Sequence, residues 1–145
     1  MVHQTGHWAR RRSRKAAMQA VYQWQMTGSD VVPLEQEYRA AGALKKADES
    51  FFSALVRGVL LRTEELDALL APVLDRPVEQ LDRVEAALLR LGAFELKHRI
   101  DVPYRVVIDE YVELAKTYGA EESYKYINGV LDRLAAELRQ AERGT

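Results

Sequence analysis

Residues 84–99 read VEAALLRLGAFELKHR, and this stretch decides the fold class. Its apolar side chains recur three and four positions apart, which is the spacing of one face of an α-helix. These residues are Val84, Ala87, Leu88, Leu91 and Phe94. The stretch ends on the cations of residues 97–99, which suit the negative end of a helix dipole. We therefore expect a helix over residues 84–99.

The same period runs through most of the chain, with apolar stripes over residues 17–27, 52–70, 107–118 and 127–138. We expect residues 52–70 to form one long helix that stops before Pro72, and Gly119 to end the next-to-last helix in a left-handed conformation. No segment alternates apolar and polar residues for long enough to indicate a strand. The sequence therefore predicts an all-α fold with six or seven helices.

Length and composition narrow the class of protein. A chain of 145 residues is long enough to bury a core without disulfides or metals. The absence of cysteine excludes a disulfide framework, thiolate metal sites and cysteine nucleophiles. No uncharged apolar run approaches the roughly 18–20 residues of a membrane span, and no signal peptide is apparent. We expect a cytoplasmic protein that makes no use of a membrane.

Charge is distributed unevenly along the chain. The net charge of −1 conceals a first segment, residues 1–29, that has no acidic residue and holds five cations. These are Arg10, Arg11, Arg12, Arg14 and Lys15. A basic arm on an acidic body favours contact with a polyanion, and guanidinium groups suit RNA because they grip phosphate and stack on bases. We place the run at the start of the first helix, where like charge does not favour the helix, and the alternative is an arm that is merely solubilising or disordered.

Two tyrosines near the last helix form a second candidate contact. Tyr124 and Tyr126 stand two positions apart and so face different directions on a helix. We expect one of them to be exposed and able to stack on a nucleotide base. The competing interpretation is two half-buried tyrosines with hydrated hydroxyl groups.

Catalysis finds little support in the sequence. Asp109 and Glu113 share a helix face at positions i and i+4, which is one way to present two carboxylates to a metal or a substrate. A metal site of that kind needs further ligands such as a histidine, and none is present in this helix. We interpret the pair as solvated carboxylates, and we expect no enzymatic activity, no cofactor and no metal.

Several blocks of sequence occur in series from residue 9 to residue 134. The blocks that carry the most information are Ala9–Arg14, Gln19–Trp24, Val84–Arg90, Val102–Glu110 and Tyr126–Asp132. Two of them contain the patterns P-Y-x-x-x-I-x-E and Y-x-N-G-V-L-D. This series resembles the NusB family of bacterial transcription antitermination factors.

The resemblance implies a fold and a function. Proteins of the NusB family are all-helical, with two perpendicular three-helix subdomains. They pair with the small-subunit ribosomal protein NusE, bind the boxA RNA element of rRNA leader transcripts and join the RNA polymerase antitermination complex, without catalysis. Some members self-associate, so the resemblance also allows a homodimer. The alternative function is a helical adaptor that binds protein and whose basic arm contacts an acidic partner.

The resemblance also implies site residues by matching position. The RNA-binding set comprises Arg10, Arg11, Arg12, Arg14, Arg76, Glu122 and Tyr126, to which the charge run adds Lys15. Tyr22 and Glu85 match the surface that meets NusE. Glu122 stands where the family has aspartate and Tyr126 where phenylalanine is common, so the carboxylate and the aromatic ring are retained.

The amino terminus departs from the family pattern. Residues 1–8 extend beyond the usual start, and we expect them to form a flexible extension of one RNA-binding domain over residues 9–145. Trp8 within this extension is either an additional stacking contact or a loose aromatic side chain, and the sequence favours neither.

Overall fold

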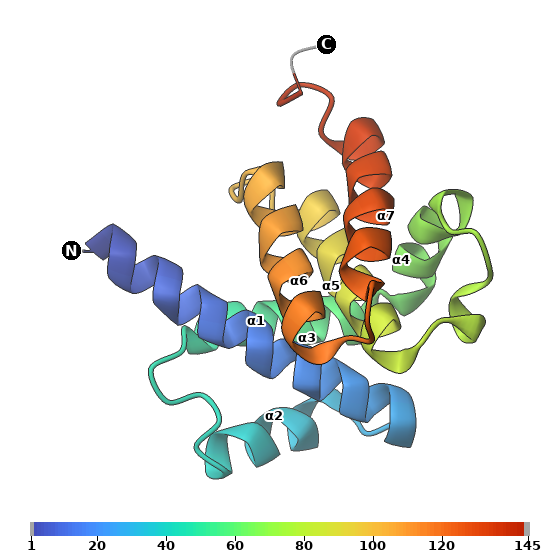
Figure 1. The fold of residues 1–145 in the computed structure, drawn as a ribbon. Helices are drawn as coiled ribbons and strands as arrows, with labels where there is room; N and C mark the ends of the chain where they lie inside the picture. The colour runs from blue at the N-terminus through green and yellow to red at the C-terminus, as the bar shows by residue number, and fades with distance from the viewer. Residues whose placement is uncertain (1, 144–145) are drawn as a thin grey trace. The chain divides into compact units, whose positions relative to one another are not determined.

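The structure is a computed structural model that describes residues 2–143, with side chains described for residues 6–143. Within residues 2–143 the regular structure is entirely helical (Figure 1). The α-helices are α1 (Val2–Thr27), α2 (Val31–Ala40), α3 (Glu49–Leu61), α4 (Thr63–Leu70), α5 (Arg83–His98), α6 (Tyr104–Tyr118) and α7 (Ser123–Leu138). Short 3-10 helices η1 (Ala71–Val73) and η2 (Val78–Gln80) lie between α4 and α5. The all-α prediction is confirmed, and no helix in this described part is long and apolar enough to cross a bilayer.

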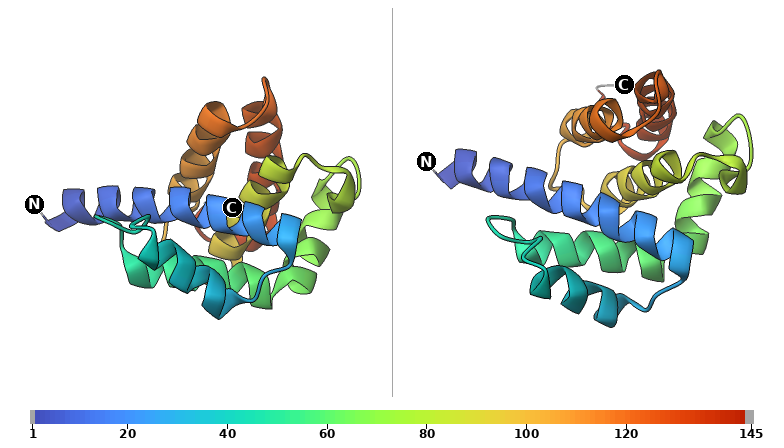
Figure 2. Two further views of the ribbon diagram at one scale, coloured as in Figure 1. Left: turned by 90° about the horizontal axis from the view of Figure 1, so that it is seen from below. Right: turned by 60° about the horizontal axis from the view of Figure 1, so that its bottom comes forward.

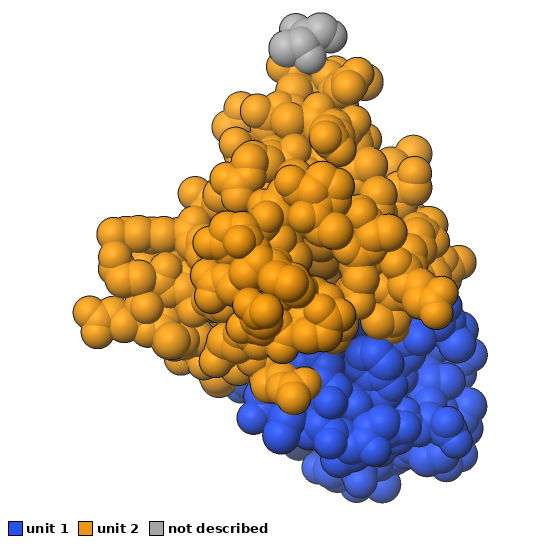
Figure 3. Space-filling view, turned by 90° about the vertical axis from the view of Figure 1, so that its right-hand side faces the viewer, with its two compact units in different colours: residues 1–61 blue, residues 62–145 orange. Residues whose placement is uncertain are grey.

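The chain forms two compact units that divide between Leu61 and Arg62 (Figure 3). The expectation of one long helix over residues 52–70 is therefore wrong, because the chain leaves the helical conformation at Arg62, where φ is −124° and ψ is 24°. The apolar stripe continues through this break, since Val59 and Leu66 are seven residues apart. Seven residues make about two helical turns, so the spacing alone does not reveal the break.

The first unit consists of α1, α2 and α3, with α1 packed on both of the others (Figure 2). The buried face of α1 is built from small side chains, among them Ala17, Ala20 and Val21, which have no exposed surface. The facing helix α3 buries larger side chains, including Phe52 and Leu55. Small residues opposite large ones let two helices approach closely, so the long α1 rests firmly on the shorter α3.

A buried carboxylate joins α2 to α3. Glu35 of α2 is only 1% exposed and accepts hydrogen bonds from Arg57 at 2.8 and 3.1 Å and from Ser53 at 2.9 Å. Burial alone would raise the pKa of Glu35, but the hydrogen bonds from Arg57 and Ser53 outweigh it and hold the pKa below its usual value. The charged carboxylate is thus the form that stabilises this helix pair.

The second unit packs α5, α6 and α7 against one another and places α4 on α5. Gly92 permits the close approach of α5 and α7, because a Cβ atom at this position would lie 2.8 Å from a methyl carbon of Leu131. A buried guanidinium then closes the end of the unit. Arg139, just after α7, donates to the carbonyl oxygens of residues 95, 96, 99 and 102 at 2.7–3.1 Å.

The turn between α6 and α7 differs from the sequence expectation. Gly119 has φ −86° and is extended, so the prediction of a left-handed glycine stop is wrong. The glycine serves close packing instead, since a Cβ there would lie 2.7 Å from the carbonyl oxygen of Ala115. The left-handed residue is Glu122, with φ 73°, directly before α7. A non-glycine residue in this region is strained, and this one belongs to the predicted RNA-binding set.

Candidate nucleic-acid interface

The arginine run of the first unit divides between two faces of α1. Because α1 begins at Val2, the run lies about two turns inside the helix, and our placement of it at the helix start is wrong. Arg10 and Arg14 turn toward α3, where their guanidinium carbons lie 4.4 and 4.9 Å from the centre of the Phe51 ring. The Arg10 Nε also lies 3.8 Å from the Asp48 carboxylate. Arg14 is only 2% exposed, so it presents almost no surface to a phosphate.

Ser13 explains why this face of α1 is fixed. Its Oγ donates to the carbonyl oxygen of Asp48 at 2.7 Å and accepts from the backbone N–H of Asp48 at 3.0 Å. Asp48 in turn accepts the Phe51 N–H on its carboxylate at 3.0 Å, which caps the start of α3. The side chains at positions 10, 13 and 14 therefore fasten α1 to the first turn of α3.

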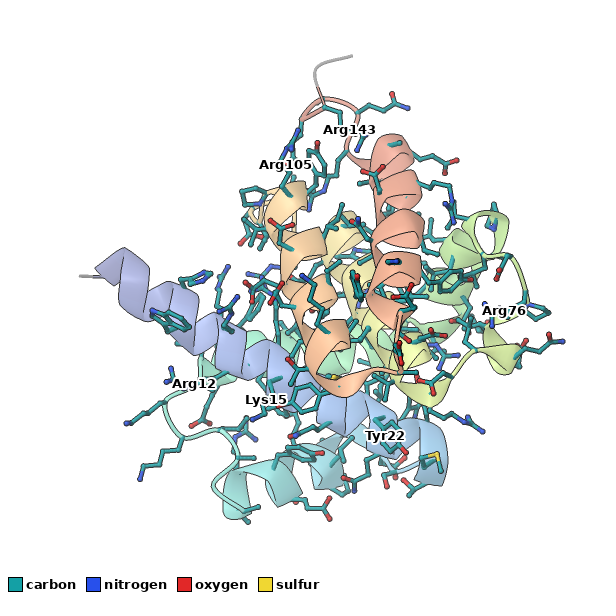
Figure 4. The ribbon with its side chains drawn as sticks, in the orientation of Figure 1. Arg12, Lys15, Tyr22, Arg76, Arg105 and Arg143 are labelled. Atoms are coloured by element: carbon teal, nitrogen blue, oxygen red, sulfur yellow. The ribbon has the colours of Figure 1, made fainter. Side chains whose placement is uncertain are left out.

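The other three cations of the run lie on a second face of α1. Arg12 and Lys15 are exposed and Arg11 is half-buried. The Arg11 guanidinium lies 5.2 Å from the ring of Trp8, one turn earlier on the same face. Figure 4 labels Arg12 and Lys15 along this helix. The predicted basic arm is thus an ordered helical face with three outward cations.

The second unit brings together two predicted residues that are fifty positions apart in the sequence. Tyr126 at the start of α7 donates its hydroxyl hydrogen to the Asp75 carboxylate at 2.8 Å. Arg76, labelled in Figure 4, pairs with the same carboxylate at 2.9 Å, and its guanidinium carbon lies 5.1 Å from the centre of the Tyr126 ring. These three side chains form one cluster, which we call the Asp75 cluster. It offers a cation and an aromatic ring side by side.

Electrostatics within the Asp75 cluster favour the charged carboxylate. The hydrogen bonds from Arg76 and then from Tyr126 lower the pKa of Asp75. Burial and the hydrogen bond to Asp75 raise the pKa of Tyr126, so the phenol stays protonated as a donor. The negative charge of Asp75 orients both partners, and it also opposes a phosphate that approaches Arg76.

Of the remaining candidates, Glu122 lies at the start of α7, Glu85 in α5 and Tyr22 in α1. Glu122 is exposed and pairs with Lys125 at 2.7 Å. The neighbouring Ser123 donates to the carboxylate of Glu85 at 2.7 Å, so Glu85, which we matched to the NusE surface, lies beside the predicted RNA contacts. Tyr22, the other residue matched to that surface, belongs to the first unit and is 40% exposed on α1.

The two tyrosines of α7 differ from our expectation. Both Tyr124 and Tyr126 are half-buried, so the prediction that one of them is exposed is wrong. Two lysines lie near the ring of Tyr124, with the Lys116 Nζ at 5.3 Å and the Lys125 Nζ at 6.0 Å from its centre. Each of the two tyrosine rings therefore has at least one cation within about 6 Å of its centre.

The acidic pair in α6 has an ordinary surface environment. Asp109 and Glu113 are both exposed, and Glu113 pairs with Lys116 at 3.2 Å. Among the residues that the structure describes, no three histidine or acidic side chains gather in a way that could hold a metal ion.

Sequence reasoning missed Asp75, which holds Arg76 and Tyr126 in place. The only signal was its position next to Arg76 in a loop before a proline. Its contact with Tyr126 spans 51 residues, and no local spacing shows a contact of that range.

The fold and these surfaces define an all-helical protein with a cationic helix face and an arginine–tyrosine cluster. A sequence model of the NusB family matches residues 11–136. The transcription antitermination protein NusB of Alcanivorax borkumensis is 55% identical over 134 residues, which are 92% of this chain and 89% of that protein. The chain therefore belongs to the NusB family of transcription antitermination proteins.

Two solved structures share the fold. The structure of T. maritima NusB has a TM-score of 0.80 and 32% sequence identity, and the match covers 94% of this chain and 97% of that chain. A crystal structure of the antitermination factors NusB and NusE in complex with double-stranded RNA has a TM-score of 0.76 and 25% identity, over 88% of this chain and 96% of that one.

Proposed function

We propose that this chain is a transcription antitermination factor that binds boxA-type single-stranded RNA of rRNA leader transcripts together with the ribosomal protein NusE and loads onto elongating RNA polymerase. One observation carries the proposal: Arg11, Arg12 and Lys15 line one outward face of α1, in a segment without any acidic residue. Membership of the NusB family and the likeness to a structure of NusB with NusE and double-stranded RNA support RNA as the ligand and NusE as the partner. The role needs no catalysis, and it belongs in the cytoplasm.

Within this proposal the five cations have different tasks. The outward residues Arg11, Arg12 and Lys15 contact phosphates directly. Arg10 and Arg14 act indirectly, because they are engaged with Phe51 and hold α1 on α3. Residues 9–145 serve as one RNA-binding domain, with residues 1–8 as its extension.

Residues of the second unit contact the bases of the RNA. Arg76 offers a cation and Tyr126 a ring, and Asp75 fixes their relative position. Glu122 lies one helical turn before Tyr126 and can accept hydrogen bonds from a base edge. NusE would meet the exposed Tyr22 and the carboxylate of Glu85, where an acidic body suits a basic ribosomal protein.

The experiment is a titration of a labelled boxA-type RNA and a scrambled RNA, followed by fluorescence anisotropy with and without NusE across a salt series. We expect NusE to tighten binding of the boxA RNA selectively. Replacing Arg12 or Lys15 by alanine should flatten the salt dependence by about 0.7 log units for each lost single-strand phosphate contact. Lys97→Ala, at the exposed end of α5, is the matched control and should leave the slope unchanged.

Two outcomes would contradict the proposal. Equal and weak binding of both RNAs, with or without NusE, would leave only a generic polyanion contact and favour the protein-binding adaptor. An unchanged slope in both Arg12→Ala and Lys15→Ala would remove the outward face of α1 from the RNA interface.

A further inference from the structure

The exposed face of α1 extends further than its cations. At about 100° per residue, positions 8, 11, 12 and 15 fall within about one third of the helix circumference. Trp8 therefore shares the face of Arg11, Arg12 and Lys15, one turn closer to the amino end. The axial rise from Trp8 to Lys15 is about 10 Å, which makes a continuous strip of one aromatic and three cationic side chains.

Trp8 is ordered on this face and remains open to solvent. It is 47% exposed, which is unusual for a large aromatic side chain on a packed helix. The His7 ring meets it edge-on at 5.6 Å between ring centroids, and the Arg11 guanidinium lies 5.2 Å from its ring. These two neighbours orient the indole within its own helix.

The amino-terminal turns of α1 extend past the helices that support the rest of it. α1 has 26 residues and α3 has 13, and the link from Ser13 to Asp48 fixes the start of α3 beside the middle of α1. In both views of Figure 2 the first turns of α1 project beyond α2 and α3. Fold stability of the first unit thus gives no reason for an indole at position 8.

We propose that Trp8 is an additional base-stacking residue, which takes one unpaired nucleotide base of a single-stranded RNA whose phosphates lie along Arg11, Arg12 and Lys15. The inference rests on the proposed RNA-binding function and adds a subsite to it. An indole stacks on any base, because every base has a π face, and a neighbouring guanidinium strengthens the contact. A base within a duplex is already stacked on its neighbours, so the subsite selects unpaired RNA.

Two readouts test the subsite in the full chain. The first is affinity: Trp8→Leu, which keeps an apolar side chain but removes the π face, should weaken binding of single-stranded boxA-type RNA by about fivefold or more. The salt slope should stay as in the wild type, since stacking releases no counterions. Met26→Ala is the matched control, because Met26 is a 56% exposed apolar side chain five turns along the same face. It should bind RNA as the wild type does.

The second readout is tryptophan fluorescence. The chain has only two tryptophans, Trp8 and Trp24, so the RNA-induced quenching that Trp8→Leu abolishes belongs to Trp8. We expect single-stranded RNA to quench this emission and a duplex of the same sequence to leave it unchanged. Circular dichroism of Trp8→Leu should match the wild type, which shows that the helix persists.

Three results would overturn the inference, and they are distinguishable. If the wild type binds boxA RNA but Trp8→Leu binds it equally well, the subsite is wrong and the proposed function stands. If NusE quenches Trp8 and RNA does not, the indole serves a protein contact. If the wild type binds no RNA, the proposed function and the subsite fail together.

Discussion

The buried guanidinium of Arg139 provides the sharpest test of what holds the second unit together. It is 3% exposed and donates to four backbone carbonyl oxygens in the last turn of α5 and in the turn that leads to α6. Carbonyl groups at a helix end lack partners further along the helix, so Arg139 supplies donors there. The carbonyl oxygens of Glu95 and Arg99 also accept the backbone N–H groups of Arg99 and Val102 at 3.0 Å, so Arg139 is a second donor to these two. Its remaining donor capacity goes to Glu142, which also accepts the Tyr104 N–H at the start of α6 at 3.0 Å.

Arg139→Met retains the apolar stem and removes all of these donors. At a net value of about 1 kcal/mol for each of the four carbonyl bonds, the free energy of unfolding should fall by about 4 kcal/mol. For a chain of this size that loss corresponds to a Tm lower by roughly 10 °C. Arg139→Lys should lose about half as much, because an ammonium group keeps the charge without the planar fork.

Urea unfolding followed by circular dichroism at 222 nm, together with thermal melts, measures these losses. Arg133→Met is the control, since this exposed arginine of α7 donates a single bond, to the Val73 carbonyl at 2.9 Å. The control should cost less than about 1 kcal/mol. An Arg139→Met protein within about 1 kcal/mol of the wild type would refute the reasoning, because water would then serve these carbonyls equally well.

Three further predictions follow from single contacts. The pKa of Glu35 is lowered in the folded chain, so the carboxylate contributes its full stabilisation above the usual value of 4.5 and loses it as pH falls through the folded pKa. Glu35→Gln should therefore reduce the loss of unfolding free energy at acid pH, measured by urea unfolding across pH. An unchanged loss would contradict the role given to Glu35. Gly92→Ala should lower the free energy of unfolding by about 1–3 kcal/mol in urea unfolding, because the added methyl group overpacks against Leu131. The loss should be smaller in a Leu131→Ala background. A stabilised Gly92→Ala variant would show that α5 and α7 move apart freely. Asp75→Ala should weaken RNA binding about threefold, because Arg76 and Tyr126 lose the carboxylate that fixes their relative position, and unchanged or tighter binding in anisotropy would contradict this positioning role.

The helical class was predictable because apolar spacing is a local property that survives packing. The boundary between α3 and α4 was not, because Val59 and Leu66 keep the helical period across a break that only the backbone angles at Arg62 reveal. The same limit applies to Gly119, whose close contact with the Ala115 carbonyl oxygen takes the place of the expected left-handed turn. Spacing predicts which residues share a face, and it carries no information about where the backbone turns.

Single residues of the candidate site could be predicted from the sequence, but the contacts that join them could not. Position matching selected Arg76 and Tyr126 separately, and the structure joins them through Asp75. Glu85 was assigned to a different surface, yet its hydrogen bond to Ser123 places it beside Glu122. These contacts link residues 38 to 51 positions apart, and they depend on how α5 and the loop that contains Asp75 meet α7 in the folded unit.

Five cations within six residues cannot all face one ligand when the segment is helical. Successive positions turn by about 100°, so the run surrounds the helix, and the side that packs on α3 must accept some of the charge. Phe51 and Asp48 stabilise the charge on this packed side. The Phe51 ring attracts the guanidinium groups of Arg10 and Arg14, and the Asp48 carboxylate attracts that of Arg10. One arginine run thus holds α1 in place and presents charge on its outer face. Alanine scanning by affinity alone would score all five cations as RNA contacts, since a displaced α1 also binds poorly. Two measurements together separate the groups. Substitution of Arg10 or Arg14 should lower the free energy of unfolding, and substitution of Arg11, Arg12 or Lys15 should change the salt dependence of RNA binding.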